Sequence, residues 1–181
     1  LDVLNVKIRP EMATDHLTPE QRREFHVLRA RSLFLGQREM GINRPENNEA
    51  IRGEYETAEK LHEQVTPDDV HYLAQTLLAL GDIDGAVTRA QRLPGPMTPQ
   101  RIELLKQMIE ADLAHEPPRY TRAIDLITQL SGEPRLAVND RLWALTRQAE
   151  VLVATGFAND AITKLVRTLP RLDDVPPEAM G

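Results

Sequence analysis

The sequence predicts an all-α fold, built as an α-solenoid of antiparallel helix pairs, and three observations lead to this prediction. A short hydrophobic pattern with the steps of one helix face occurs three times. The three copies are Ile83, Ala86, Val87, Ala90 and Leu93; Tyr120, Ala123, Ile124, Ile127 and Leu130; and Ala158, Ala161, Ile162, Leu165 and Leu169. Their first residues lie 37 and 38 positions apart, and an alanine upstream of each copy (Ala74, Ala111 and Ala149) keeps the same two spacings. No segment alternates with period two over the length of a strand, so the repeated unit is a pair of helices, and this period is typical of stacked repeats.

The composition fits this fold and excludes several classes of function. The chain of 181 residues has room for about four to five helical repeats, and only 4% of its residues are aromatic. A formal net charge of -6 disfavours binding to a phosphate backbone, which needs clustered Lys and Arg. The absence of cysteine excludes disulfides, thiolate catalysis and cysteine-based zinc sites, and no apolar stretch is long enough to span a membrane. The chain starts at Leu1, which indicates processing or excision from a longer protein.

Helix boundaries follow from capping residues, prolines and glycines. Thr18, Thr66 and Thr98 each precede a proline. Threonine caps the first turn, and proline fits the first helical position because its missing N–H is not needed there. We expect helices over residues 19–40, 49–64, 67–80, 83–93, 99–115, 119–131, 136–155 and 158–169. They form a repeat domain over 18–170, with a lead-in segment over 1–17 and a tail, or a linker to a further repeat, over 171–181.

The apolar residues of the first four helices predict which side of each faces the core. In helix 19–40 the inward residues are Phe25, Leu28 and Leu35, and with them Phe34. Residues 41–48 form a loop before helix 49–64. In helix 67–80 the inward residues are Val70, Leu73, Ala74 and Leu77. Gly81 and Asp82 turn the chain into helix 83–93, which Pro94, Gly95 and Pro96 end.

Glycine and proline also separate the last four helices. Pro117 and Pro118 end helix 99–115, Gly132 ends helix 119–131, and Gly156 separates helix 136–155 from helix 158–169.

The helix pairs resemble tetratricopeptide repeats. That family has a leucine and a small residue in the first helix, a glycine in the turn and a nearly fixed alanine in the second helix. The segment 70–93 matches through Leu73, Ala74, Gly81 and Ala86. The segment 145–169 matches through Ala149, Leu152, Gly156 and Ala161, and the segment 107–130 through Ala111, Tyr120 and Ala123, with Pro117 and Pro118 in place of the glycine. The resemblance implies a right-handed superhelix, in which alanine lets neighbouring helices pack closely.

The first pair fits the pattern in either of two registers. Tyr55 and Ala58 repeat the spacing of Tyr120 and Ala123 but lie only 28 residues before the next copy. A register on Ala50 and Ile51 gives a better period of 36 but turns Glu54 and Thr57 inward.

The resemblance also implies a groove for a partner peptide or helix, because the first helix of each tetratricopeptide pair lines the inner surface. Its candidate residues are His71, Gln75, Leu78, Leu105, Met108, Asp112, Trp143, Thr146, Glu150 and Val153. Trp143 is the expected anchor, since large aromatic side chains dominate binding hot spots. The alternative is that Trp143 packs against a neighbouring helix or a missing repeat. Some family members bind chaperone C-termini with Lys and Asn at these positions, and neither residue type occurs there.

The sequence contains no recognisable catalytic, metal or cofactor site. The five histidines form no ligand motif, and Asp68 and Asp69 stand at a helix start, where acids complement the macrodipole. Neither Ser32 nor Ser131 lies in a nucleophile elbow, and no glycine-rich phosphate loop occurs. Arginines around residues 119–141 alternate with acids, which indicates a solvated surface rather than a nucleic-acid patch. We therefore expect no enzyme activity, no metal and no cofactor in this chain.

These observations favour a scaffold or adaptor that binds another protein or peptide, and the acids of the groove favour basic partners. Two alternatives stay open. The chain is a non-catalytic regulatory segment of a larger enzyme or of a membrane-anchored assembly protein, or it is a structural module that forms homo-oligomers through its end repeats. We expect a soluble chain, cytoplasmic or periplasmic, with no nucleic-acid partner.

Overall fold

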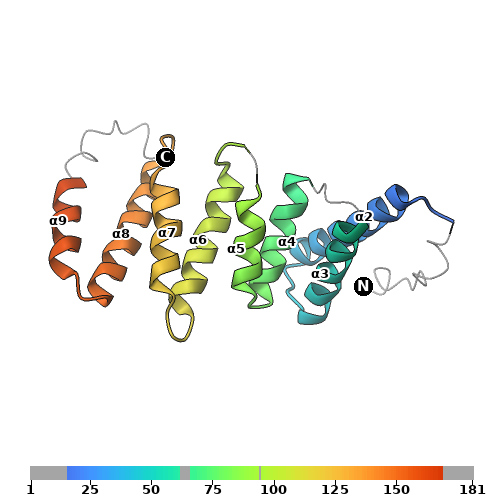
Figure 1. Ribbon diagram of the computed structural model, residues 1–181, viewed down its shortest axis with the longest axis horizontal. Helices are drawn as coiled ribbons and strands as arrows, with labels where there is room; N and C mark the ends of the chain where they lie inside the picture. Colours follow the sequence, from blue (N-terminus) through green and yellow to red (C-terminus); the bar gives the residue numbers. More distant parts are fainter. Residues whose placement is uncertain (1–15, 62–65, 94, 169–181) are drawn as a thin grey trace. The chain divides into compact units, whose positions relative to one another are not determined.

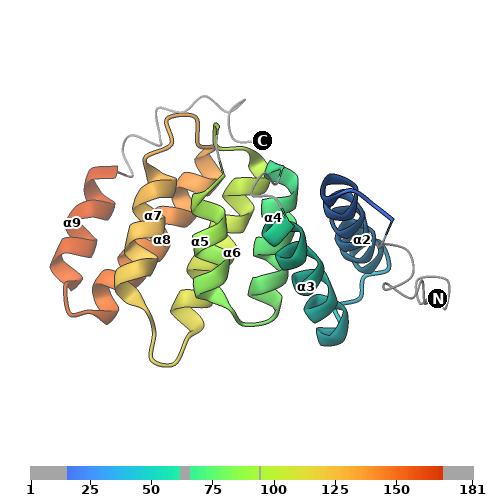
Figure 2. The ribbon, with the colours of Figure 1, turned by 45° about the vertical axis from the view of Figure 1, so that its right-hand side comes forward.

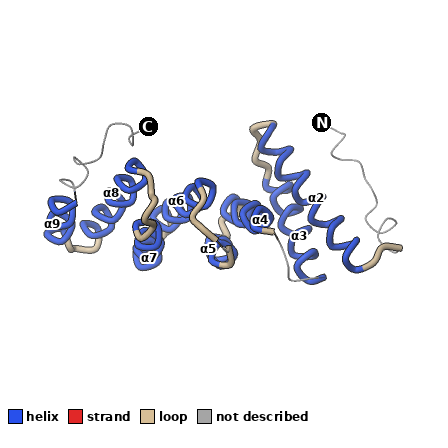
Figure 3. Tube along the Cα trace, turned by 90° about the horizontal axis from the view of Figure 1, so that it is seen from above, coloured by secondary structure: helices blue, strands red, loops and turns tan. Residues whose placement is uncertain are grey.

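A computed structural model describes residues 16–61, 66–93 and 95–168, and within these ranges the chain forms eight α-helices and no strand (Figure 1, Figure 3). The predicted all-α class is therefore confirmed for the described residues. The chain divides into two compact units, Leu1–Pro96 and Met97–Gly181. Most of the expected lead-in segment, all of the tail and Leu169 of the third hydrophobic pattern lie outside the described residues.

The first unit contains α2 (Pro19–Glu39), α3 (Pro45–Leu61), α4 (Pro67–Ala79) and α5 (Ile83–Gln91). Within this unit α2 contacts α3, α3 contacts α4, and α4 contacts α5, and α2 also contacts α4. Helices α4 and α5 contact each other, and Figure 2 shows the short turn that joins them. Gly81 in that turn has a φ of 78°, a left-handed conformation that glycine adopts without steric cost, so the predicted turn is confirmed.

The predicted threonine caps are confirmed at three helix starts. Thr18 forms a capping box with Gln21, and Thr66 forms one with Asp69. At the start of α6 (Pro99–Ala114), the Thr98 hydroxyl accepts a hydrogen bond from a backbone N–H in the first turn. Because cap and proline are local signals, they fix these starts independently of tertiary packing.

Helix α3 starts at Pro45, four residues before the predicted start, because part of the expected loop is helical. The N–H of Asn48 donates to the carbonyl of Arg44 at 3.0 Å, which is the first helical hydrogen bond. The Asn48 side chain is buried, and its Oδ1 accepts from Gln37 Nε2 of α2 at 2.9 Å. This polar contact stabilises a first turn that the apolar pattern does not reveal.

The burial of residues along α3 distinguishes the two registers predicted for the first pair. Tyr55 and Ala58 are fully buried, whereas Ala50 is exposed. Burial along α3 therefore matches the register of Tyr55 and Ala58 better than the other one, of which Ile51 is buried but Ala50 is not.

The predicted core side is confirmed for α4 but is wrong for α2. All four predicted residues of α4 are buried, namely Val70, Leu73, Ala74 and Leu77. On α2, Leu28 and Leu35 are exposed, and the two phenylalanines are half-buried. The buried residues of α2 are Val27, Ala30 and Gln37. Ala30 is fully buried, and its small side chain allows the close approach of a neighbouring helix.

The second unit contains α6, α7 (Tyr120–Ser131), α8 (Val138–Ala154) and α9 (Ala158–Thr168). The contacts run in chain order, from α6 to α7, from α7 to α8 and from α8 to α9. Figure 1 shows these four helices side by side in that order. Gly156 takes a φ of 91° in the connection between α8 and α9, as the predicted turn requires.

The repeated hydrophobic pattern marks the core in most of its copies. In the first copy all five residues are buried, and in the second copy Ala123, Ile127 and Leu130 are buried. In the third copy Ala161 is buried, but Ala158 and Ile162 are exposed, so the predicted inward face of α9 is wrong in part. Within the described ranges no helix follows α9.

Candidate functional site

The ten predicted partner-binding residues divide into three groups by burial. On α4, His71, Gln75 and Leu78 are half-buried. On α6, Leu105, Met108 and Asp112 are buried in the core. On α8, Trp143 is half-buried, and Thr146, Glu150 and Val153 are exposed. Only the residues of α4 and α8 therefore present side-chain surface to a partner.

The expected exposure of the three α6 residues is wrong. Leu105 and Met108 pack into the apolar core of the second unit. Asp112 is fully buried because Arg122 of α7 pairs with it: Arg122 Nε donates to Asp112 Oδ2 at 2.7 Å, and Arg122 Nη2 donates to Oδ1. Because both oxygens of the buried carboxylate are paired with the arginine, Asp112 stabilises the contact between α6 and α7. It is not available to bind a partner protein.

His71 lies on α4 beside an aromatic contact. The rings of Phe34 (α2) and Tyr72 (α4) stack with centroids 4.7 Å apart, and the His71 ring meets Tyr72 edge-on at 6.0 Å. Burial lowers the pKa of His71, and the nearby charge of Arg38 adds to this effect. The lowered pKa favours the neutral form of His71.

The strongest candidate site lies on α6 and α8 of the second unit. Lys106 Nζ of α6 lies 5.4 Å from the ring centroid of Trp143, and Arg147 Cζ of α8 lies 5.7 Å from it. Both distances fall within the range of cation–π attraction. Trp143 thus packs in part against a neighbouring helix, as one of the two sequence interpretations expects, and keeps part of its surface open.

Ion pairs hold the two cations in place around Trp143. Lys106 Nζ pairs with Asp140 of α8, and Arg147 Nε lies 2.7 Å from Glu110 Oε1 of α6. Arg147 also pairs with Glu150 at 2.6 Å. The hydrogen bond to Glu150 raises the pKa of Arg147 most, and the charge of Glu110 adds to it. We call Lys106, Glu110, Asp140, Trp143 and Arg147 the Trp143 surface.

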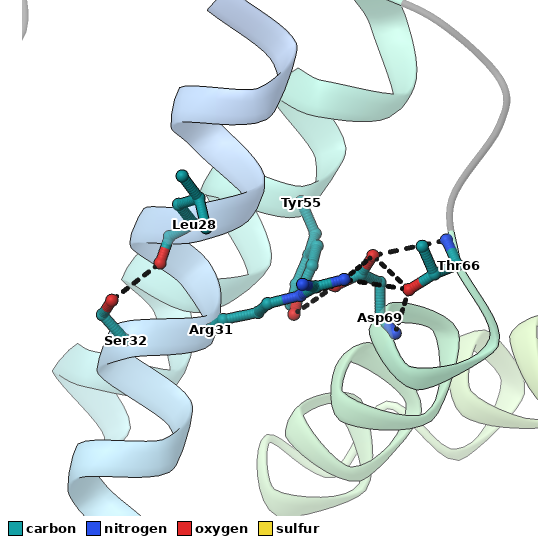
Figure 4. Close-up of polar contacts among 6 residues, drawn as sticks. All are labelled: Leu28, Arg31, Ser32, Tyr55, Thr66 and Asp69. Carbon is teal, nitrogen blue, oxygen red and sulfur yellow. Dashed lines mark hydrogen bonds and ion pairs between the residues drawn. The ribbon is translucent and has the colours of Figure 1, made fainter.

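A second polar cluster joins three helices of the first unit (Figure 4). Arg31 of α2 reaches Asp69 of α4, with Nε 2.6 Å from Oδ1 and Nη2 2.9 Å from Oδ2. The hydroxyl of Thr66 donates to Asp69 Oδ2 at 2.6 Å, and that of Tyr55 of α3 donates to Oδ1 at 3.3 Å. Burial raises the pKa of Tyr55 and the charge of Asp69 raises it further, so Tyr55 stays a neutral donor.

This cluster is structural, because Asp69 is almost closed to solvent. The sequence interpretation explained Asp69 by the helix macrodipole alone, which omits the ion pair. A signal for the pair does exist in the sequence: Arg31 and Asp69 lie 38 positions apart, close to the repeat period. Glu110 and Arg147 lie 37 positions apart, as do Lys106 and Trp143.

Within the described ranges, no three or more His, Asp or Glu residues gather in a group that could hold a metal ion. His62 lies outside these ranges. None of the described helices is both long and apolar enough to cross a membrane.

Comparison with other proteins found no matching protein family, no similar curated protein and no similar solved structure.

Proposed function

We propose that this chain is a protein-interaction module of the tetratricopeptide-repeat type, in which helix pairs stack as a right-handed solenoid. Contacts between helices one repeat apart support this arrangement within each unit. Phe34 stacks on Tyr72, 38 positions later, and Glu110 pairs with Arg147, 37 positions later. Such contacts follow if the first helices of successive pairs lie next to each other.

The observation that carries the binding function is the placement of Trp143, the single tryptophan of the chain. It is half-buried on a first helix, and two cations from two helices fix its ring. A tryptophan held in one orientation loses little entropy when a partner covers it, which favours affinity. Exposed Thr146, Glu150 and Val153 extend the surface along α8.

The partner that fits this surface is a protein segment with an apolar side chain and a basic residue next to it. The apolar side chain covers the open part of Trp143. The carboxylates of Glu110 and Glu150 are exposed enough to meet a cation, with 45% and 51% of each side chain open to solvent. Binding of this kind needs no catalytic group, so the proposed role is that of a scaffold or adaptor.

The test uses a displayed library of random peptides selected against the full chain. A selected peptide is then titrated, by fluorescence anisotropy, against the chain and against Trp143→Ala. We expect Trp143→Ala to weaken binding at least about tenfold, as for a hot-spot aromatic residue.

Phe157→Ala is the matched control, because Phe157 is an exposed aromatic residue of the same unit that lies outside the Trp143 surface. It should leave the affinity unchanged. Selection of no peptide, or equal binding by Trp143→Ala, would refute this site.

A further inference from the structure

The two cations of the Trp143 surface differ in how far water reaches their ion pairs. The side chains of Lys106 and its aspartate partner are 21% and 23% exposed. The side chain of Arg147 is 32% exposed, and those of its partners Glu110 and Glu150 are 45% and 51% exposed. Ion pairs between exposed side chains contribute little to stability, because water screens the charges and the paired side chains lose entropy. The pairs of Arg147 therefore open more easily than the pair of Lys106.

Arg147 binds two carboxylates that come from two helices. Its Nε lies 2.7 Å from Glu110 Oε1 of α6, and its Nη1 donates to Glu150 Oε2 of α8 at 2.6 Å. The same guanidinium group lies over the ring of Trp143. A planar guanidinium directs several donors along fixed lines and also stacks on aromatic rings, whereas the ammonium of lysine is a compact point charge. The two carboxylates and the ring thus form a place that fits one guanidinium group, and we call it the guanidinium place.

The charges of the guanidinium place do not balance. Glu110 and Glu150 bring two negative charges, and Arg147 brings one positive charge, so one negative charge is in excess. An excess of negative charge on a binding surface attracts a basic partner and repels an acidic one. A second guanidinium group therefore meets an attractive field here, and Arg147 is the group that it must displace.

We propose that Arg147 occupies a place that an arginine of the partner protein takes on binding, so that Arg147 competes with the partner. The inference rests on the proposed function, because it uses the Trp143 surface as the partner site. When the partner's arginine lies between Glu110 and Glu150, Arg147 turns to solvent, and Lys106 keeps its contact with the ring. The site thereby selects arginine over lysine, and Arg147 weakens every such complex.

Tripeptides with blocked ends test the proposal as probes, each with leucine on both sides of arginine, lysine or glutamine. The fluorescence of Trp143, the single tryptophan, reports binding to the full chain. Arg147→Gln should bind the arginine probe about tenfold more tightly than the wild type does, because two exposed ion pairs and one cation–π contact no longer compete with it. The lysine probe should gain less, and the affinity for the glutamine probe should not change.

Two further variants separate competition from net charge. Arg135→Gln removes one positive charge from an exposed position of the same unit outside the Trp143 surface, and it should bind all three probes like the wild type. Arg147→Lys keeps the charge but loses the planar group, so it should bind the arginine probe about threefold more tightly than the wild type. Circular dichroism establishes that each variant is folded, and Arg147→Lys tests the competition without a change of charge.

The outcomes for this inference and for the proposed function are distinguishable. If Arg147→Gln and Arg147→Lys bind the arginine probe no more tightly than the wild type, Arg147 does not compete and the inference is wrong. It is also wrong if Arg135→Gln gains as much as Arg147→Gln, or if the lysine probe gains as much as the arginine probe. Selected peptides that depend on Trp143 would in each case still support the proposed function. If the arginine probe gains as expected but selected peptides ignore Trp143, the inference stands and the proposed partner site is wrong.

Discussion

Each unit contains an ion pair between a buried aspartate and a partly exposed arginine, and the two pairs are arranged in opposite ways. In the first unit, Asp69 is the third residue of α4 and pairs with Arg31 of α2. In the second unit, Asp112 lies in the last turn of α6 and pairs with Arg122 of α7. The side chains of Asp69 and Asp112 are 1% and 0% exposed. The pairs differ in where the carboxylate sits along its helix.

That position determines what stabilises the charge. Asp69 lies at the positive end of the α4 macrodipole, and it accepts hydrogen bonds from Thr66 and Tyr55 in addition to Arg31. Asp112 lies at the negative end of the α6 macrodipole, which disfavours a carboxylate, so the charge of Arg122 carries more of the stabilisation. A buried acid at a helix start is held largely by local sequence, whereas one at a helix end depends on an arginine from another helix.

The largest expected effect is that of Arg122→Met. The substitution keeps an apolar stem but leaves the buried Asp112 carboxylate without its cation, which costs about 3–5 kcal/mol. Urea unfolding followed by the fluorescence of Trp143, the single tryptophan and a residue of the same unit, measures the loss.

A double variant separates loss of the pair from loss of packing. Asp112→Leu combined with Arg122→Met removes both charges and should recover most of the lost stability. A single-variant loss below about 1 kcal/mol would mean that Arg122 does not carry the stabilisation of Asp112.

A smaller effect is expected for Arg31→Met. Thr66 and Tyr55 still donate to Asp69, and the α4 macrodipole still favours its charge, so the expected loss is about 1–3 kcal/mol. Urea unfolding followed by circular dichroism measures it. Arg29→Met is the control on the same helix, because Arg29 is 39% exposed in its pair with Glu54 and should cost about 1 kcal/mol or less. If Arg31→Met lowers the free energy of unfolding as much as Arg122→Met does, both aspartates depend equally on their arginines, and the proposed difference between the two pairs is wrong.

The helices could be predicted from the sequence because their signals are local. Thr66 and Pro67 fix the start of α4, and the spacing of Leu73, Ala74 and Leu77 fixes its core side. The same reasoning fails on α2, where apolar side chains line two sides of the helix and only tertiary contact selects one of them. It also places the start of α3 too late, because a buried hydrogen bond between Gln37 and Asn48 stabilises the first turn.

The candidate site was only partly predictable. The resemblance to tetratricopeptide repeats placed both Trp143 and Asp112 in the groove, and residue type made Trp143 the expected anchor. Nothing in the local sequence indicates that Arg122 pairs with Asp112 and that Asp112 is buried. Contacts between α6 and α8 do join residues separated by the period of the sequence pattern, as with Lys106 and Trp143, 37 positions apart. This spacing identifies contacting residues only when the register of the repeat is known.

The smallest expected effect is the response of the first ion pair to acid. Burial by itself raises the pKa of Asp69, but hydrogen bonds from Arg31 and Thr66 outweigh it, and the net pKa lies below the ordinary value of 3.8. Between these two values the unfolded chain binds more protons than the folded one, so the free energy of unfolding falls as the pH falls. The stabilisation by Asp69 is complete above pH 3.8 and is lost as the pH falls through its folded pKa.

Comparison with Asp69→Asn isolates this contribution, because the other carboxylates titrate in both proteins. The difference in the free energy of unfolding between wild type and Asp69→Asn should be constant from pH 7 to about pH 5 and should shrink below pH 3.8. The effect is smaller than that of Arg31→Met because a protonated Asp69 still accepts hydrogen bonds from Thr66 and Tyr55. A difference that grows in acid would mean that burial, and not the ion pair, dominates the titration of Asp69, and the first pair would then depend on its arginine no less than the second.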